Sequence, residues 1–248
     1  MSAKKRRNSI YVIYEGYSEE YFLEHLEKHS EVRLNRKFCG GGSSNEIVIK
    51  GIIYSDRDVN VYVFFDEDFE SKPNQKISDE TLEKLAKMWK LDKDALMDCP
   101  YKHLQSKNKN MRNPILVVSC PQSMEGILLR LLDSSKKDEL KGKTTKELKK
   151  TIDSLLDNIK LIDDDKRQIQ EYMEKIDKYS EEKKQLKQSD ANYRERNEYL
   201  KSKIKDYERK INKVTFMRFL DEKLPLSAII AGRDAVPAID ILLKAFGF

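Results

Sequence analysis

Cysteine and histidine are scarce in this sequence, with three residues of each among 248. The cysteines show no Cys-x-x-Cys spacing, so the sequence predicts neither a zinc site nor a disulfide framework. No apolar run approaches the roughly 20 residues that a membrane-spanning helix needs. No apolar stretch near the N-terminus is long enough for a secretory signal. We therefore expect a protein of the cytoplasm that does not associate with membranes.

Charged residues, by contrast, are abundant. They make up 37% of the chain, against about 25% in an ordinary globular protein. The net charge is +5 and the isoelectric point about 8.8, which weakly favours a polyanionic partner because Lys and Arg release counterions from phosphates. The excess of charge is concentrated between about Lys136 and Lys213.

The first half of the chain alternates runs typical of strands with runs typical of helices. β-Branched and aromatic runs predict buried strands, at 10–14, 32–38, 59–65 and 115–119. Helices are expected between and after them, one with Ser18 as its N-cap, one at 46–53, one at 79–90 and one from about Met124. This order predicts an α/β domain, Rossmann-like, with a largely parallel sheet.

The charged middle of the chain has a different texture. Apolar residues recur at spacings of four and three from Leu148 to Ile162 and from Tyr193 to Val214, a pattern of helices that pack along one seam. We interpret 136–213 as a long α-helical hairpin or small bundle inserted into the α/β domain. Plain packing or dimerisation explains the seam and a solvated face explains the charges. The insertion could also be a surface for a partner.

The last residues return to a globular composition, so 9–135 and 214–248 are expected to form one discontinuous domain. The apolar run 226–231 is predicted to be a last strand. Pro237 is placed for the first turn of a final helix, and Gly247 for its end.

Acidic residues follow three of the predicted strands. Glu15 ends the first strand, Asp66 and Asp68 end the strongest one, and Glu125 lies shortly after the fourth. Because the carboxyl ends of parallel strands meet at one rim, these acids are expected to converge. Crowded carboxylates repel each other, and Mg²⁺ is a hard cation that prefers carboxylate oxygen. The pattern thus favours a centre for Mg²⁺ or Mn²⁺ that could activate water against a phosphodiester.

Three motifs resemble one family. YEGYSEEYFL (14–23), FFDED (64–68) and SCPQSMEGILL (119–129) are similar to segments of Toprim-domain nucleases of the OLD-like and RloB-like kind. A Toprim chain with a helical insertion also resembles the AriB-type effectors of the PARIS anti-phage defence systems. The resemblance covers about 9–133.

The resemblance implies a role for each matching residue. Glu15 would be the catalytic carboxylate, and Asp66, Asp68, Glu19 and Glu125 would ligate the metal. It further implies a Toprim fold and a toxic antiviral endonuclease. Its substrate would be RNA, with tRNA as the first candidate, and a separate ABC-type ATPase would control it.

Other readings stay open. The chain could be a Toprim DNA nuclease, or a non-catalytic partner-binding and assembly module that uses the helical insertion. A homodimer is compatible with the exposed seams. Tyr193, Tyr199 and Tyr207 could stack on unpaired bases, although two of them fall on the seam and packing accounts for most of that signal. Arg233 and Lys244 are the candidates for a basic catalytic group. His25 is expected to be a packed or half-exposed histidine.

Overall fold

The computed structural model of the chain describes residues 9–39, 44–54, 60–66, 87, 114–119, 123–187 and 192–248. The chain divides into two compact units. The first comprises Met1–Ile152 with Leu224–Phe248, and the second is Asp153–Lys223. In the described part of the chain, no helix is both long and apolar enough to cross a membrane.

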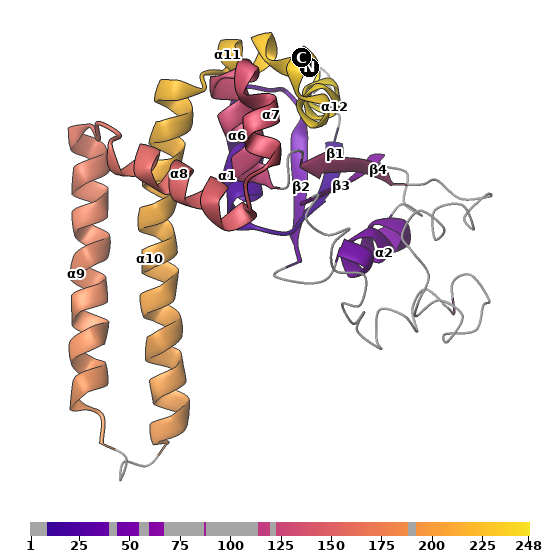
Figure 1. The fold of residues 1–248 in the computed structure, drawn as a ribbon. Helices are drawn as coiled ribbons and strands as arrows, with labels where there is room; N and C mark the ends of the chain where they lie inside the picture. Colours follow the sequence, from indigo (N-terminus) through magenta and orange to yellow (C-terminus); the bar gives the residue numbers. More distant parts are fainter. Residues whose placement is uncertain are drawn as a thin grey trace, which may run out of the picture. The chain divides into compact units, whose positions relative to one another are not determined.

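A parallel sheet of four strands forms the centre of the first unit (Figure 1). Its strands lie in the order β2-β1-β3-β4 and every neighbouring pair is parallel. Their bounds are Ser9–Tyr14 for β1, Arg33–Phe38 for β2, Asn60–Asp66 for β3 and Ile115–Ser119 for β4. The predicted mixed α/β class and parallel sheet are confirmed, and each strand begins and ends within one residue of its predicted bounds.

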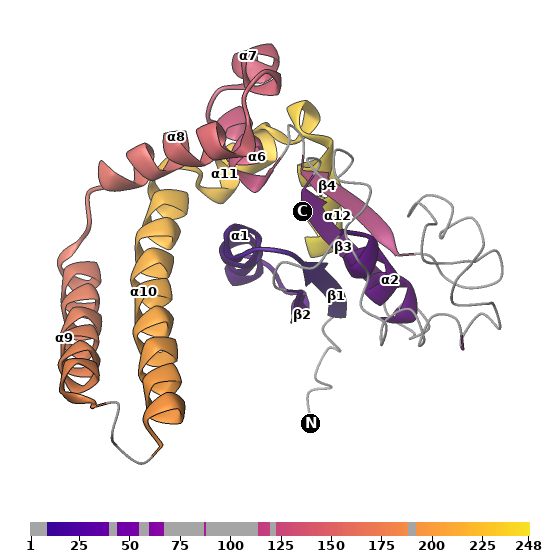
Figure 2. The same cartoon turned by 60° about the horizontal axis from the view of Figure 1, so that its bottom comes forward.

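Helices cover both faces of this sheet. The chain moves from β1 to β2 in one direction and from β2 to β3 in the other. Right-handed crossovers therefore place α1 (Tyr17–Lys28) and α2 (Ser44–Tyr54) on opposite faces. The final helix α12 (Pro237–Phe246) contacts both α1 and β4 and so shares the face of α1 (Figure 2). Helix α6 (Met124–Leu132) follows β4 and contacts β4 and α1.

The core of this unit fills the space between the sheet and its helices. Side chains of the central strands, such as Val12, Ile13 and Phe64, are fully buried, as is Phe22 of α1. On the other face α2 lies so close to β3 that a Cβ at Gly51 would overlap the side chain of Val63. The uninterrupted apolar character of β1 and β3 is thus explained by burial on both faces.

The C-terminal segment, Leu224–Phe248, belongs to the first unit. After η3 (Arg233–Ala235), α12 begins with Pro237 in its first turn and ends at Gly247, whose φ is 83°, as the sequence predicts. The buried Arg130 of α6 donates a hydrogen bond to the carbonyl of Ala235. This contact fixes the C-terminal segment to α6.

One element of this segment differs from the prediction. The run 226–231, predicted as a strand, is the helix α11 (Leu226–Ala231). The carbonyl of Pro225 accepts hydrogen bonds from the N–H groups of Ala228 and Ile229, which starts the helix. A six-residue apolar run fits a strand or a helix equally well by its pattern alone.

Helices also fill the chain between α6 and the second unit. The short η2 (Ser134–Lys136) and α7 (Lys137–Lys141) lead to α8 (Thr145–Asp157). Leu148 and Ile152 of α8 are buried. The N-terminal stretch of the first unit, Met1–Ile152, ends within α8.

The second unit is a helical hairpin. Helices α9 (Asp163–Gln185) and α10 (Tyr193–Lys223) pack side by side and run antiparallel (Figures 1 and 2). Helix α10 is about 46 Å long at 1.5 Å per residue. It continues without a break through residue 213, where the composition of the sequence changes. The compact unit therefore ends at residue 223, ten residues beyond the boundary that the composition suggests.

Aromatic and ionic contacts join the two helices of the hairpin. The ring of Tyr207 lies 5.8 Å from that of Tyr172 and 5.9 Å from that of Tyr179, between centroids. Arg218 donates two hydrogen bonds to the carboxylate of Asp165, at 2.6 and 3.2 Å. Tyrosine contacts and a bidentate ion pair therefore both contribute to the seam between α9 and α10.

Candidate metal centre

The strand order creates a topological switch point at the carboxyl edge of the sheet. From β1 the chain crosses to β2 on one side, whereas β3 and β4 lie on the other side. The carboxyl ends of β1 and β3 therefore flank a topological switch point, the usual ligand-binding place in open α/β sheets. Glu15 follows β1 directly, and Asp66 is the last residue of β3. The fold places two of the predicted site residues at the ends of the two strands that flank this switch point.

Glycine at position 16 allows the Glu19 side chain, in the first turn of α1, to lie close to the backbone that precedes the helix. Gly16 precedes α1, and a Cβ at this position would lie 2.6 Å from Oε2 of Glu19. A Cβ so near would force the Glu19 carboxylate to shift from its present position. The Glu-Gly signal in the sequence thus reflects the packing of a carboxylate against the backbone.

The first turn of α6 brings Glu125 to the same edge. The Ser18 hydroxyl of α1 donates a hydrogen bond to Oε1 of Glu125 at 3.2 Å, across 107 positions of sequence. The N–H of Met124 donates to Oδ1 of Asp66 at 3.2 Å. The start of α6 is therefore attached both to α1 and to the end of β3.

Electrostatic coupling shows how close these acids lie. Glu19 is 3% exposed, and its pKa is raised from 4.5 to about 7. Burial is the largest cause, and the negative charges of Glu125 and Glu15 add to it, while backbone hydrogen bonds at Glu19 and Gly16 oppose it. Glu15, Glu19 and Glu125 therefore share one electrostatic environment, as expected for carboxylates crowded at one rim.

Four of the five predicted site residues thus come together. Asp68, the fifth, lies outside the described residues. Within the described ranges, no three of these carboxylates offer oxygen atoms that all lie within 4.8 Å of one another. The site is an open arrangement of acids, and Mg²⁺, which retains several waters and uses one or two carboxylates, is suited to such a site.

The sequence did not predict the environment of three serines near this edge: Ser18, Ser119 and Ser123. Ser18 was predicted as the N-cap of α1, and this is wrong: Gly16 holds that position and Ser18 lies inside the first turn. The hydroxyls of Ser119 and Ser123 are buried and have no hydrogen-bond partner among the described residues. The hydrogen bond of Ser18 could not be predicted, because its partner Glu125 lies 107 positions away in the sequence.

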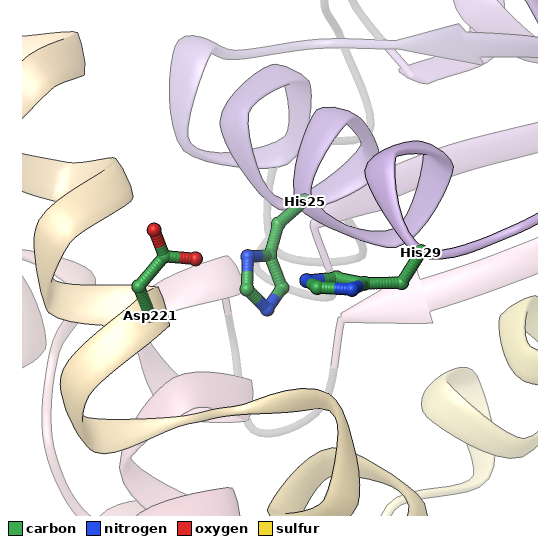
Figure 3. A group of neighbouring side chains, drawn as sticks. All are labelled: His25, His29 and Asp221. Atoms are coloured by element: carbon green, nitrogen blue, oxygen red, sulfur yellow. The ribbon is translucent and has the colours of Figure 1, made fainter.

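The structure also describes Lys244, Arg233 and His25. The ammonium of Lys244 lies 2.6 Å from Asp240 of its own helix, and Arg233 is exposed. His25 is fully buried on α1, with its ring 5.1 Å from that of His29 one turn later (Figure 3). His25 is therefore a packed histidine, as expected. Asp221, also labelled there, belongs to the second unit.

Comparison with protein-family models, with curated proteins and with solved structures finds no match to this chain. The assignment of a function therefore depends on the geometry at the carboxyl edge of the sheet.

Proposed function

We propose that this protein is a divalent-metal-dependent phosphodiester hydrolase that cleaves nucleic acid. The observation that carries the proposal is the convergence of Glu15, Glu19, Asp66 and Glu125 at the switch point of a parallel sheet. These acids come from three segments that are far apart in sequence. A surface loop that is merely acidic would not assemble them around a buried carboxylate.

The chemistry of this donor set fits a hard divalent cation. Glu19 and Glu125 form no ion pair with Lys or Arg in the described part of the chain. A carboxylate as buried as Glu19 is costly to ionise without a compensating positive charge. Mg²⁺ or Mn²⁺ would supply that charge, held by one or two carboxylates drawn from Asp66, Asp68, Glu19 and Glu125.

The residues divide into two roles. Bound divalent cations lower the pKa of water and stabilise the charge that develops on a phosphodiester. The ligating carboxylates hold and orient the ion. Glu15 follows β1, across the switch point from Asp66 at the end of β3. In this proposal it accepts the proton of the attacking water. Its carboxylate is close enough to raise the pKa of Glu19, so it lies next to the ligand set.

The proposed substrate is RNA, and tRNA is the first candidate among RNAs. DNA is the second choice. The net charge of +5 favours a polyanion. The Toprim-like motifs add the expectation of a toxic antiviral endonuclease under the control of an ABC-type ATPase.

A cleavage assay tests the proposal. Total RNA and plasmid DNA are incubated with the wild-type protein in Mg²⁺, Mn²⁺ or EDTA, and with Glu15→Ala. We expect metal-dependent cleavage that Glu15→Ala reduces by at least ~10²-fold, the size expected for loss of a general base. Growth arrest on expression, absent for Glu15→Ala, provides a second readout in cells. Equal activity of both proteins would contradict the assignment.

The hairpin favours a second candidate function, the docking of a protein partner. Every side chain of α9 is described, and none is fully buried. Met173 and Tyr199 are about half exposed. The chemistry assigned to the first unit needs nothing from these helices. Replacing residues 158–222 with a flexible linker is expected to preserve metal-dependent cleavage and to abolish co-purification with a co-expressed ABC-type ATPase.

A further inference from the structure

The Ser18–Glu125 hydrogen bond joins two helices at the candidate centre. Ser18 lies in the first turn of α1 and Glu125 in the first turn of α6. The donor oxygen lies 3.2 Å from Oε1. Glu125 is half-buried, so its side chain retains room to turn toward solvent. A hydrogen bond to a charged group is strong enough to select one orientation.

Glu125 needs such a restraint because its neighbours repel it. The carboxylates of Glu19 and Glu15 share its electrostatic environment. Within the described residues, no Lys or Arg forms an ion pair with Glu125. Coulomb repulsion alone would drive a half-buried carboxylate outward, away from the other acids. The Ser18 hydroxyl opposes that movement from the same helical turn that carries Glu19.

The backbone of α6 is held separately. The N–H of Met124 donates to Asp66, which fixes the start of α6 relative to β3. That bond sets where the Cα of Glu125 lies, but it does not set the direction of the side chain. Ser18 supplies the missing restraint, and it can accept a bond or donate one without carrying charge.

We propose that Ser18 is a positioning residue that holds the Glu125 carboxylate toward the other acids, in the orientation that ligates the metal. This inference rests on the proposed function. It assigns Ser18 a role through Glu125 and no contact with substrate. Hydrogen-bond partners of metal ligands typically contribute 10–100-fold to metal affinity, so the effect is measurable.

The test is Mn²⁺ affinity of the full chain, measured by titration calorimetry, together with the Mg²⁺ concentration that gives half-maximal cleavage. Ser18→Ala removes the hydroxyl, and Ser18→Cys keeps the volume but leaves only a weak donor. Ser18→Thr retains the hydroxyl. The matched control is Ser135→Ala, which removes a serine–carboxylate bond of 2.6 Å to Asp133, at the opposite end of α6 from Glu125.

We expect Ser18→Ala and Ser18→Cys to weaken Mn²⁺ binding about 10-fold and to raise the half-maximal Mg²⁺ concentration similarly. Cleavage at saturating Mg²⁺ should change little. Ser18→Thr should restore binding, and Ser135→Ala should not alter it. In a Glu125→Gln background, Ser18→Ala should have no further effect, because the two residues act as one unit.

The outcomes separate the two ideas. If the wild-type protein binds no Mn²⁺, the proposed function fails and Ser18 has nothing to position. If the wild type binds and Ser18→Ala binds equally, only the positioning role is overturned. A loss in Ser18→Ala that persists in the Glu125→Gln background would also overturn it, because Ser18 would then act independently of Glu125.

Discussion

The two units of the molecule differ in how completely they bury their side chains. In the first unit, strands and helices surround residues such as Val12, Phe22 and Phe64, which are fully buried. In the second, the 23 residues of α9 include no buried side chain, and the 31 residues of α10 bury Leu200, Phe216, Phe219 and Leu220. An α/β sandwich has an interior, whereas two helices alone have a single seam. The first unit can therefore enclose a buried carboxylate such as Glu19, whereas α9 presents mostly exposed side chains.

The difference in burial also suggests that the two units have different functions. Sites with precise geometry need rigid elements whose side chains are locked by packing. The acids lie at the ends of β1 and β3 and in the first turns of α1 and α6, all elements of the well-packed unit. The hairpin, with tyrosines and ion pairs along its seam, has few comparable restraints. This comparison predicts that the same kind of substitution has very different consequences in the two units.

The largest expected difference is in core truncation. Phe22→Ala in α1 should lower the free energy of unfolding of the first unit by about 3–5 kcal/mol, since it leaves a large cavity. Met173→Ala in α9, where the side chain is 49% exposed, should change stability by less than about 0.5 kcal/mol. Urea denaturation followed by circular dichroism measures both. Similar losses in the two variants would invalidate the contrast in burial.

A pH dependence should be specific to the first unit. The pKa of Glu19 is about 7 in the folded protein and 4.5 in the unfolded chain. The folded state therefore binds more protons between these values, and stability falls as pH rises. The contribution is fully present below pH 4.5 and is lost as pH passes about 7, with a total of about 3 kcal/mol at 1.36 kcal/mol per pKa unit.

Hydrogen exchange in EDTA, measured at several pH values, should show this loss in the sheet. Glu19→Gln carries no titrating carboxyl and should remove the dependence. Saturating Mg²⁺ should also flatten it, because the ion stabilises the charged form. If the free energy of opening of the wild-type sheet were the same at pH 5 and pH 8, this would contradict the burial of an ionisable Glu19.

Two glycines provide a matched pair within the first unit. At Gly16 a Cβ would lie 2.6 Å from the Glu19 carboxylate, whereas at Gly142 the nearest atom is 3.9 Å away. Gly16→Ala should cost about 1–3 kcal/mol and weaken metal binding at least ~10-fold, because Glu19 must move. Gly142→Ala should be neutral or stabilise by up to about 1 kcal/mol. Thermal denaturation and Mn²⁺ titration compare the two variants. Equal stability and equal Mn²⁺ affinity of Gly16→Ala and Gly142→Ala would contradict the packing argument for Gly16.

The smallest expected effect concerns the hairpin. Arg218→Ala removes the bidentate pair with Asp165 that joins α10 to α9, and we expect a loss of about 1–2 kcal/mol in hairpin stability. Lys166→Ala, which removes an exposed pair with Asp163, should have no measurable effect. Hydrogen exchange in α9 reports both. If Arg218→Ala leaves α9 protection unchanged, the pair does not hold the hairpin together.

The fold was predictable where burial imposes a pattern. The four strands are β-branched or aromatic runs, and each was placed within one residue. Pro237 and Gly247 marked the last helix because their backbone requirements are local. The strand order was not predictable, since it depends on which strands pair. The helix Leu226–Ala231 was mistaken for a strand because a short apolar run carries no period that separates the two.

The site was predictable in its acids and not in its hydrogen bonds. Glu15, Asp66 and Glu125 could be grouped because each follows a strand, and the ends of parallel strands share one rim. The Ser18–Glu125 contact spans 107 positions and leaves no local signal. The elevated pKa of Glu19 likewise depends on burial, which follows from how α1 and α6 pack together.

The most direct test of the central claim is Mn²⁺ binding followed by electron paramagnetic resonance. Wild-type protein is titrated beside Asp66→Asn and Glu125→Gln, with Glu222→Gln in the second unit as a control of equal charge change. The account predicts saturable binding to the wild type and to Glu222→Gln, and a loss of at least ~10-fold in the other two. No saturable binding, or equal binding by all four proteins, would contradict a metal centre at the carboxyl edge of the sheet.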